Sequence, residues 1–247
     1  VSFDSKENEN NDNFSKEHLI KLLNNKNYNE AYKIVILNLN HKSNDSRLWF
    51  IMGVVCRINV DFKNADICLL SAMKLEPNEV KILLEYCHNL LDLKDYKRIL
   101  KTIKNYDTDF QSKPEVTYIM ALYYMNNQNY IEARDNFLSV LRTKKNIENL
   151  FFNYAVLLSS MEKHFLARKY YIKALFLKPD DFNTLQNLSG TYIILGKYED
   201  AKLILKKILS YDPNNIKALI NSGIIYLRQR KINQAKELFK KVLTIDK

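Results

Sequence analysis

The sequence contains few of the residues that a turn-rich protein needs. Its 247 residues include only four glycines and four prolines. This scarcity argues against β-sandwich and β-barrel architectures and favours long helices joined by short turns, so we expect an all-α fold. Lys, Asn or Glu interrupts the apolar runs every few residues, so the sequence has no stretch of about 18 apolar residues able to cross a membrane.

Cysteine is also scarce. Cys56, Cys68 and Cys87 lie in apolar runs without CxxC spacing, and we expect them to be small buried side chains rather than disulfide partners or metal ligands. Such cysteines favour a reducing compartment, so the cytoplasm is favoured although the sequence does not fix the location.

The motifs of nucleotide binding and hydrolysis are missing. No GxxxxGK[ST], GxGxxG, GxSxG or HExxH string occurs, and the four histidines are scattered. Cys87 and His88 are adjacent and would lie about 100° apart on a helix, which is a poor geometry for one metal ion. We therefore expect no catalytic residues, no metal site and no cofactor, and a chain that is not itself an enzyme.

What the sequence does contain is a repeat of 34 residues without insertion or deletion. Residues 1–11 are polar and charged and are predicted to form a disordered lead-in. Residues 12–247 are predicted to form seven consecutive repeats. The first positions of these repeats are Asp12, Ser46, Val80, Pro114, Glu148, Phe182 and Ile216.

Small residues recur at two positions of the repeat. Position 20 is alanine in six of the seven repeats, which accounts for six of the 11 alanines in the chain. Position 8 is also mostly small, as in Gly53, Ala121 and Gly223. Two helices of about a dozen residues can approach closely where both carry small side chains, so each repeat is predicted to be a helical hairpin. One hairpin has no adequate core, but stacked hairpins cover one another and form a solenoid.

These columns resemble the tetratricopeptide repeat. Its pattern of Trp or Leu, small, Tyr, Ala, Phe and Pro is matched in order by Trp49, Gly53, Phe62, Ala65, Leu69 and Pro77. The resemblance implies a right-handed α-solenoid, or superhelix, of helix-turn-helix hairpins. The third repeat departs from the pattern, with Ile99 and Tyr106 at positions that are usually small and no proline from Asp107 to Ser112, so we expect looser packing or a bend there.

In tetratricopeptide arrays the first helix of each hairpin lines a concave groove, and the resemblance implies that positions 2, 5, 6, 9, 12 and 13 face a ligand. Positions 5, 9 and 12 are apolar in the middle repeats, and such a strip would suit an amphipathic helix or a hydrophobic peptide. Alternatively, tight winding buries part of the strip, or a terminal segment of the same protein covers it. The apolar candidates are Phe50, Val54, Leu84, Tyr118, Leu122, Met125, Phe152 and Val156.

Asparagine occupies position 6 in the last three repeats, as Asn153, Asn187 and Asn221. An amide side chain can donate and accept, so such a row can pair with the backbone of an extended peptide. It resembles the asparagine ladder of O-linked N-acetylglucosamine transferases. The alternative is that Asn is simply a common family choice at this position.

The formal net charge of +10 is uneven, because residues 148–247 carry 17 basic and 9 acidic side chains. Basic residues recur along the second helices and predict a ridge on the convex face. This ridge could meet an acidic protein surface or an anionic membrane, or it could be a solvated face that keeps the chain soluble. No aromatic residues interleave with the lysines, so nucleic acid is not the expected partner. The ridge residues are Arg168, Lys169, Lys173, Lys202, Lys206, Lys207, Lys236, Lys240 and Lys241.

The main functional hypothesis is a non-catalytic scaffold or adaptor whose groove binds a peptide or helix of a partner protein. One alternative is the substrate-recruiting arm of a larger enzyme such as a glycosyltransferase. A second is a self-assembling scaffold, because Leu238, Val242 and Ile245 at the C-terminal end have no following repeat to cover them. That face could be covered by further repeats, by another domain or by a second copy.

Overall fold

The structure is a computed structural model that describes residues 18–19, 21–22, 25, 27–41 and 44–245. The predicted lead-in at 1–11 and the first repeat's start at Asp12 lie outside these residues. The chain divides into two compact units, residues 1–119 and residues 120–247, which we call unit 1 and unit 2. The boundary falls within helix α8 (Pro114–Asn126).

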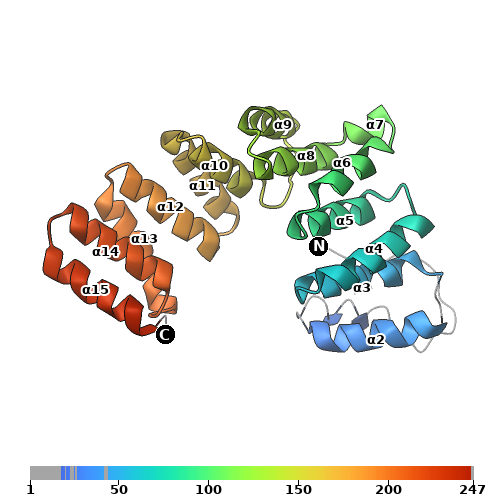
Figure 1. The fold of residues 1–247 in the computed structure, drawn as a ribbon, viewed down its shortest axis with the longest axis horizontal. Helices are drawn as coiled ribbons and strands as arrows, with labels where there is room; N and C mark the ends of the chain where they lie inside the picture. The colour runs from blue at the N-terminus through green and yellow to red at the C-terminus, as the bar shows by residue number, and fades with distance from the viewer. Residues whose placement is uncertain (1–17, 20, 23–24, 26, 42–43, 246–247) are drawn as a thin grey trace. The chain divides into compact units, whose positions relative to one another are not determined.

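The described residues form α-helices and no strand, which confirms the predicted all-α fold (Figure 1). Among these residues, no helix combines the length and the apolar content needed to cross a bilayer. In unit 1 the helices before α8 are α2 (Tyr28–His41), α3 (Ser46–Ile58), α4 (Phe62–Leu75), α5 (Val80–Asp92), α6 (Tyr96–Lys104) and α7 (Thr108–Gln111). In unit 2 the helices after α8 are α9 (Tyr130–Arg142), α10 (Leu150–Ser160), α11 (His164–Leu177), α12 (Phe182–Ile194), α13 (Tyr198–Tyr211), α14 (Ile216–Arg228) and α15 (Ile232–Ile245).

The helices follow the 34-residue spacing. Most first helices begin at position 1 of a repeat, as α3 does at Ser46 and α12 at Phe182. Polar residues just before them cap the free backbone N–H groups: the Asp45 side chain accepts from Arg47 N at 2.9 Å, and Asn215 Oδ1 accepts from Ala218 N at 3.1 Å. Every second helix begins at position 17, from Tyr28 in α2 to Ile232 in α15.

The second helices α4, α11 and α13 each pack against the first helix of their own hairpin and against the first helix of the next. In unit 1, α4 contacts both α3 and α5, and in unit 2, α11 contacts both α10 and α12. First helices of successive hairpins also touch, as α10 and α12 do. This nearest-neighbour packing is that of a helical solenoid and confirms the architecture expected from the repeat.

The small residues lie at the closest helix contacts. All six alanines at position 20 are 0% exposed. A Cβ added to Gly53, at position 8, would lie 2.5 Å from Cγ of Leu69, and one added to Gly223 would lie 2.6 Å from the Phe239 ring. Leu69 and Phe239 each occupy position 24 of the repeat to which their glycine belongs. The size of position 8 is therefore limited by the large side chain at position 24.

The turns inside the second to seventh hairpins each have a left-handed residue at position 15. Its φ is 63° at Val60, 57° at Lys94, 62° at Gln128 and 58° at Glu162. Only Gly196, with φ of 70°, is the residue type that adopts this conformation without strain. The turn geometry is therefore imposed by the packed helices on either side, and the local sequence does not encode it.

The third repeat differs where the sequence predicted it would. Its second helix, α6, has nine residues, whereas α4 has 14. The chain then forms the four-residue helix α7, whose first N–H groups are capped by Asp107 Oδ1 accepting from Phe110 N at 2.7 Å. The Tyr106 and Phe110 rings stack with centroids 4.3 Å apart. The interrupted helix thus replaces the missing proline as the end of the hairpin.

Candidate functional site

The apolar groove candidates differ in exposure. Val54, Tyr118 and Leu122 are 5%, 5% and 7% exposed and belong to the core. Phe50, Leu84, Met125, Phe152 and Val156 are half-buried. A ligand could reach the half-buried side chains directly, whereas the three buried ones act through packing. Spacing along a first helix could not separate these two groups, because both fall in columns that face the same side.

The three asparagines at position 6 also differ. Asn187 on α12 is exposed, whereas Asn153 on α10 and Asn221 on α14 are half-buried. Asn221 Nδ2 lies 3.4 Å from Ser189 Oγ of the preceding repeat, so this amide takes part in contacts between repeats. Asn187 is therefore the member of the row most accessible to an external backbone.

Beside Asn187 the surface of α12 is open. A Cβ added to Gly190 would meet no heavy atom within 4 Å, and Ile194 is 62% exposed. Residues three and four apart share one side of a helix. Asn187, Gly190 and Ile194 thus form one surface, which we call the α12 face, with an amide, an open position and an apolar side chain in a row.

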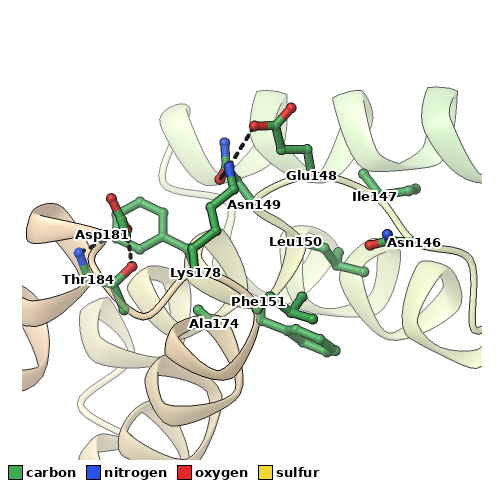
Figure 2. A pocket seen from close by; sticks show the side chains of 12 residues that line it. Asn146, Ile147, Glu148, Asn149, Leu150, Phe151, Ala174, Lys178, Asp181 and Thr184 are labelled. Carbon is green, nitrogen blue, oxygen red and sulfur yellow. Dashed lines mark hydrogen bonds and ion pairs between the residues drawn. The ribbon is translucent and has the colours of Figure 1, made fainter. Parts of the chain in front are cut away.

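A pocket of about 320 Å³ lies at one end of α10 and α11 (Figure 2). Its wall includes Phe152, one of the predicted groove residues, together with Leu150 and Leu177. Lys178 Nζ lies 2.6 Å from Glu148 Oε1, and it also donates to Asn149 Oδ1 at 3.5 Å. The pocket therefore combines an apolar wall with an ion pair at its rim, and it can accept a side chain of a ligand.

The remaining carboxylate in the pocket caps a helix. Asp181 Oδ2 accepts from the backbone N–H of Thr184 at 3.1 Å and also from the Thr184 hydroxyl. Thr184 is buried and its hydroxyl is held by Asp181, and Glu148 is paired with Lys178, so these polar groups of the pocket have structural partners. In the described part of the chain, no group of three or more His, Cys, Asp or Glu side chains could hold a metal ion.

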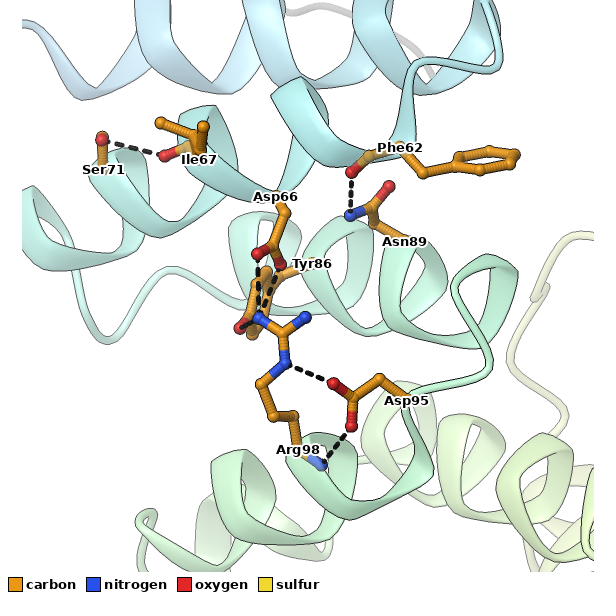
Figure 3. Close-up of polar contacts among 8 residues, drawn as sticks. All are labelled: Phe62, Asp66, Ile67, Ser71, Tyr86, Asn89, Asp95 and Arg98. Carbon is orange, nitrogen blue, oxygen red and sulfur yellow. Dashed lines mark hydrogen bonds and ion pairs between the residues drawn. The ribbon is translucent and has the colours of Figure 1, made fainter.

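A polar cluster ties together α4, α5 and α6 in unit 1 (Figure 3). Arg98 Nη1 donates to both carboxylate oxygens of Asp66 at 2.9 Å, and Arg98 Nε donates to Asp95 Oδ2 at 2.7 Å. Hydrogen bonds from the Arg98 side chain and backbone hold the pKa of Asp95 below its ordinary value. Buried Asn89 donates to Phe62 O at 3.0 Å. The hydrogen bonds of Arg98 to Asp66 and of Asn89 to Phe62 O join neighbouring repeats, so the cluster has a structural role.

Part of the predicted basic ridge is also used inside the molecule. Lys202 Nζ lies 2.8 Å from Glu199 Oε1, and Lys207 Nζ lies 2.7 Å from Asp180 Oδ1. The neighbouring Asp180 raises the pKa of Lys207. Lys173 Nζ lies 4.8 Å from the centre of the Tyr170 ring. The ridge is therefore less available for an anionic surface than its sequence suggested.

The repeat-ending prolines have a second function that sequence reasoning missed. The Tyr106 hydroxyl donates to Pro77 O at 2.6 Å, Lys207 Nζ to Pro179 O at 3.2 Å, and Lys241 Nζ to Pro213 O at 2.8 Å. In each case the donor comes from the following repeat: the two lysines lie in its second helix, and Tyr106 lies just after α6. The recurrence of lysine at position 26 after a proline at position 32 was the signal available in the sequence.

The three cysteines are buried and unpaired, as predicted. Burial raises the pKa of the Cys87 thiol to about 12. A thiol with this pKa stays protonated at neutral pH and is a poor nucleophile or metal ligand. The predicted burial of the three cysteine side chains is therefore confirmed.

Sequence reasoning also missed an exposed apolar surface on α11. Phe165, Ile172 and Phe176 are 68%, 46% and 87% exposed. Comparing columns 18, 25 and 29 could have found it, because the corresponding residues of α13 are Glu199, Lys206 and Ser210. At the C-terminal end, Leu238, Val242 and Ile245 of α15 are half-buried, and Leu243 is 69% exposed.

Two family models match the sequence. The tetratricopeptide repeat model matches residues 192–247, and the model of the ChAPs (Chs5p-Arf1p-binding proteins) matches residues 80–213, which is more than half of the chain. The chain is a tetratricopeptide-repeat protein of the ChAPs family. No curated protein matches this tetratricopeptide-repeat chain.

Solved structures share the tetratricopeptide fold at low sequence identity. A tetratricopeptide repeat protein from Parabacteroides merdae is 17% identical with a TM-score of 0.64, over 93% of this chain and 91% of that one. A chain of the APC/C hetero-tetramer Cut9–Hcn1 is 16% identical with a TM-score of 0.76, over 92% of this chain and 45% of that one. YrrB, described as having an unusual peptide-binding site, is 17% identical with a TM-score of 0.51, over 85% of this chain and 91% of that one.

Proposed function

We propose that this tetratricopeptide-repeat protein is a non-catalytic interaction module that binds an extended peptide of a partner protein along the first helices of unit 2. The family and the fold support a protein-interaction scaffold in general. The observation that carries the specific proposal is the α12 face, where an exposed amide at Asn187 lies beside open space at Gly190.

The α12 face offers two kinds of contact to a peptide. The Asn187 amide can donate to a backbone carbonyl and accept from a backbone N–H, which gives affinity without reading a particular side chain. Ile194 on the same face, and half-buried Val156 on α10, can cover an apolar side chain. The open position at Gly190 lets the peptide backbone approach α12 closely.

The pocket beside Phe152 would add selectivity. Its wall of Leu150, Phe152 and Leu177 suits an apolar or aromatic side chain, and the ion pair at its rim limits how deeply a charged one could enter. The paired state of its ionised groups supports a binding role over a catalytic one.

The test uses the open glycine. A peptide is first selected on the wild-type chain from a random phage-displayed library, and its dissociation constant is measured by fluorescence polarisation. Gly190→Trp should weaken binding at least tenfold, because the indole would occupy the space that the peptide needs. Gly190→Ala is the matched control and should change the dissociation constant less than twofold.

Phe152→Ala tests the pocket, since its half-buried ring can be removed with less damage to the core than the buried Tyr118 ring. Thermal unfolding followed by circular dichroism would check that each variant is folded. Unchanged peptide affinity in folded Gly190→Trp would refute binding at the α12 face.

The exposed side chains at the C-terminal end favour a further arrangement, self-association through α15. Leu243 and Ile232 are 69% and 58% exposed on this helix. Sedimentation velocity over a hundredfold concentration range should show a dimer that Leu243→Glu abolishes. A monomer at every concentration would exclude this arrangement and would leave the peptide-binding proposal intact.

A further inference from the structure

The outward surface of α11 combines exposed apolar and basic side chains. Phe165, Lys169, Ile172 and Phe176 follow one another at intervals of three or four residues, so they lie on one side of the helix. Lys173 is exposed beside them. We call these five residues the α11 face. Its length, from Phe165 to Phe176, is about 16 Å, or three helical turns.

The tetratricopeptide fold does not require this surface. At the three apolar positions, α13 carries Glu199, Lys206 and Ser210, and α15 carries Asn233, Lys240 and Thr244. Each of those helices forms the same kind of hairpin with polar side chains at these positions. A phenylalanine that is 87% exposed, as Phe176 is, gains little from folding. Exposed apolar patches of this kind usually mark interaction sites.

The helix of the α11 face and the two helices packed against it carry no acidic side chain. Helices α10, α11 and α12 contain no Asp or Glu, whereas α11 carries Arg168, Lys169 and Lys173. The nearest acidic residues after α11 are Asp180, paired with Lys207, and Asp181, which caps α12. The positive charge of Lys169 and Lys173 is therefore not neutralised by the helices that pack against α11.

We propose that the α11 face docks an acidic amphipathic helix of a partner protein, about three turns long. The apolar side of this helix would cover Phe165, Ile172 and Phe176, and its Asp and Glu side chains would lie beside Lys169 and Lys173. This docking is separate from peptide binding at the α12 face and does not depend on it.

Two observations favour this partner over other occupants. A second copy would bring the same lysines against each other, which opposes self-association through this face. A flat anionic membrane would be expected to meet apolar residues on several neighbouring helices, but the equivalent position on α13 presents Glu199. A surface one helix wide and three turns long matches another helix better than it matches a bilayer.

The test uses two designed peptides of 15 residues with leucine on one side and either Glu or Lys on the other. Each is labelled and titrated with the whole chain at 50 mM and 300 mM salt, and binding is followed by fluorescence polarisation. The Glu peptide should bind at least tenfold more tightly than the Lys peptide at low salt, and the difference should shrink at high salt.

The matched variant gives α11 the residues of α13: Phe165→Glu, Ile172→Lys and Phe176→Ser together. All three positions are exposed, so the variant should keep its circular dichroism spectrum and melting temperature. It should lose at least tenfold in affinity for the Glu peptide. Phe176→Ser alone is the mildest form, and Lys169→Glu with Lys173→Glu should reverse the preference between the two peptides.

Several results would overturn the proposal. These are equal binding of the two peptides, full binding by the folded triple variant, or binding of phosphatidylserine vesicles without binding of the Glu peptide. A concentration-dependent dimer that the triple variant abolishes would instead identify a second copy as the occupant. Because Gly190→Trp leaves the α11 face intact, it should bind the Glu peptide normally, which separates this test from that of the α12 face.

Discussion

The two units join their repeats with different chemistry. In unit 1 an arginine links successive hairpins: Arg57 of α3 lies 3.0 Å from both Glu85 and Asp92 of α5, and Arg98 of α6 lies 2.9 Å from Asp66 of α4. In unit 2 the contact between the successive helices α9 and α10 is aromatic, with the Phe137 and Tyr154 rings 5.5 Å apart. Tyr154 also lies 4.7 Å from the Tyr170 ring of α11, within its own hairpin.

The same helical repeat therefore uses its side chains for internal contacts in unit 1 and leaves some of them exposed in unit 2. Arg57 and Arg98 of unit 1 have carboxylate partners within the unit, which leaves these two side chains little capacity to bind another molecule. Unit 2 packs its hairpins with aromatic rings and leaves amides, lysines and apolar side chains exposed. Both proposed binding surfaces accordingly lie in unit 2.

The largest change in the free energy of unfolding is expected at position 8, where both units have a glycine in close contact. Gly53→Ala in unit 1 and Gly223→Ala in unit 2 should each lower the free energy of unfolding by about 2 kcal/mol, since the new methyl group would overlap a buried side chain. Gly190→Ala is the control and should raise it by about 0.5–1 kcal/mol, because Ala favours a helix over Gly. Urea unfolding followed by circular dichroism measures all three. Equal effects at Gly53 and Gly190 would contradict the close contact at position 8.

The two units should differ in how much stability is lost when a basic side chain is replaced by methionine. Arg98→Met should cost about 1–2 kcal/mol, because it removes hydrogen bonds to two carboxylates that are only partly exposed. Lys173→Met in unit 2 should cost about 0.5 kcal/mol or less, since it removes one exposed contact with aromatic rings. Similar losses in the two variants, measured by urea unfolding, would remove the contrast between the units.

Acid should weaken the Arg98 cluster in particular. The pKa of Asp95 is lower in the folded chain than the ordinary value of 3.8. Its contribution to stability is therefore present above pH 4 and is lost as the pH falls through the lower folded value. The gap in urea midpoint between wild type and Arg98→Met should narrow from pH 5 to pH 3. A constant gap would show that Asp95 does not contribute through this pair.

The smallest effects concern the proline carbonyls. Tyr106→Phe in unit 1 should lower the free energy of unfolding by about 1 kcal/mol, because it removes one hydrogen bond to Pro77 O. Lys207→Met in unit 2 should leave the urea midpoint almost unchanged at 300 mM salt, since its ammonium group lies in solvent and its pairs are screened. A larger loss in Lys207→Met would reverse this order.

The sequence predicted the helices well because close packing selects residue type directly. A position that faces a large neighbour across two helices must be small, so the alanines at position 20 mark the hairpin crossings. The left-handed turns were not predicted, because Val60 and Lys94 have no local preference for positive φ and are held there by the helices. The interrupted helix at Asp107 was predicted only as a departure from the pattern.

The candidate site was harder to predict than the fold. Columns identify which side of a helix faces the groove, but they do not give the depth of each side chain, so buried Val54, Tyr118 and Leu122 were grouped with half-buried Phe50 and Phe152. The open space at Gly190 depends on the absence of neighbours, which no single position encodes. The α11 face could have been recognised by comparing α11 with α13 and α15, which carry polar residues at all three apolar positions.

The carbonyl contacts of the prolines constrain how this gene can change length. Each donor follows its proline by 28 or 29 residues, so one contact spans parts of two repeats. A single inserted codon within a second helix would rotate the donor by about 100° and turn it away from its acceptor. Duplication or loss of 34 codons keeps the spacing on which these pairings depend. Lineages of this protein should therefore differ by whole modules far more often than by single-residue gaps inside them.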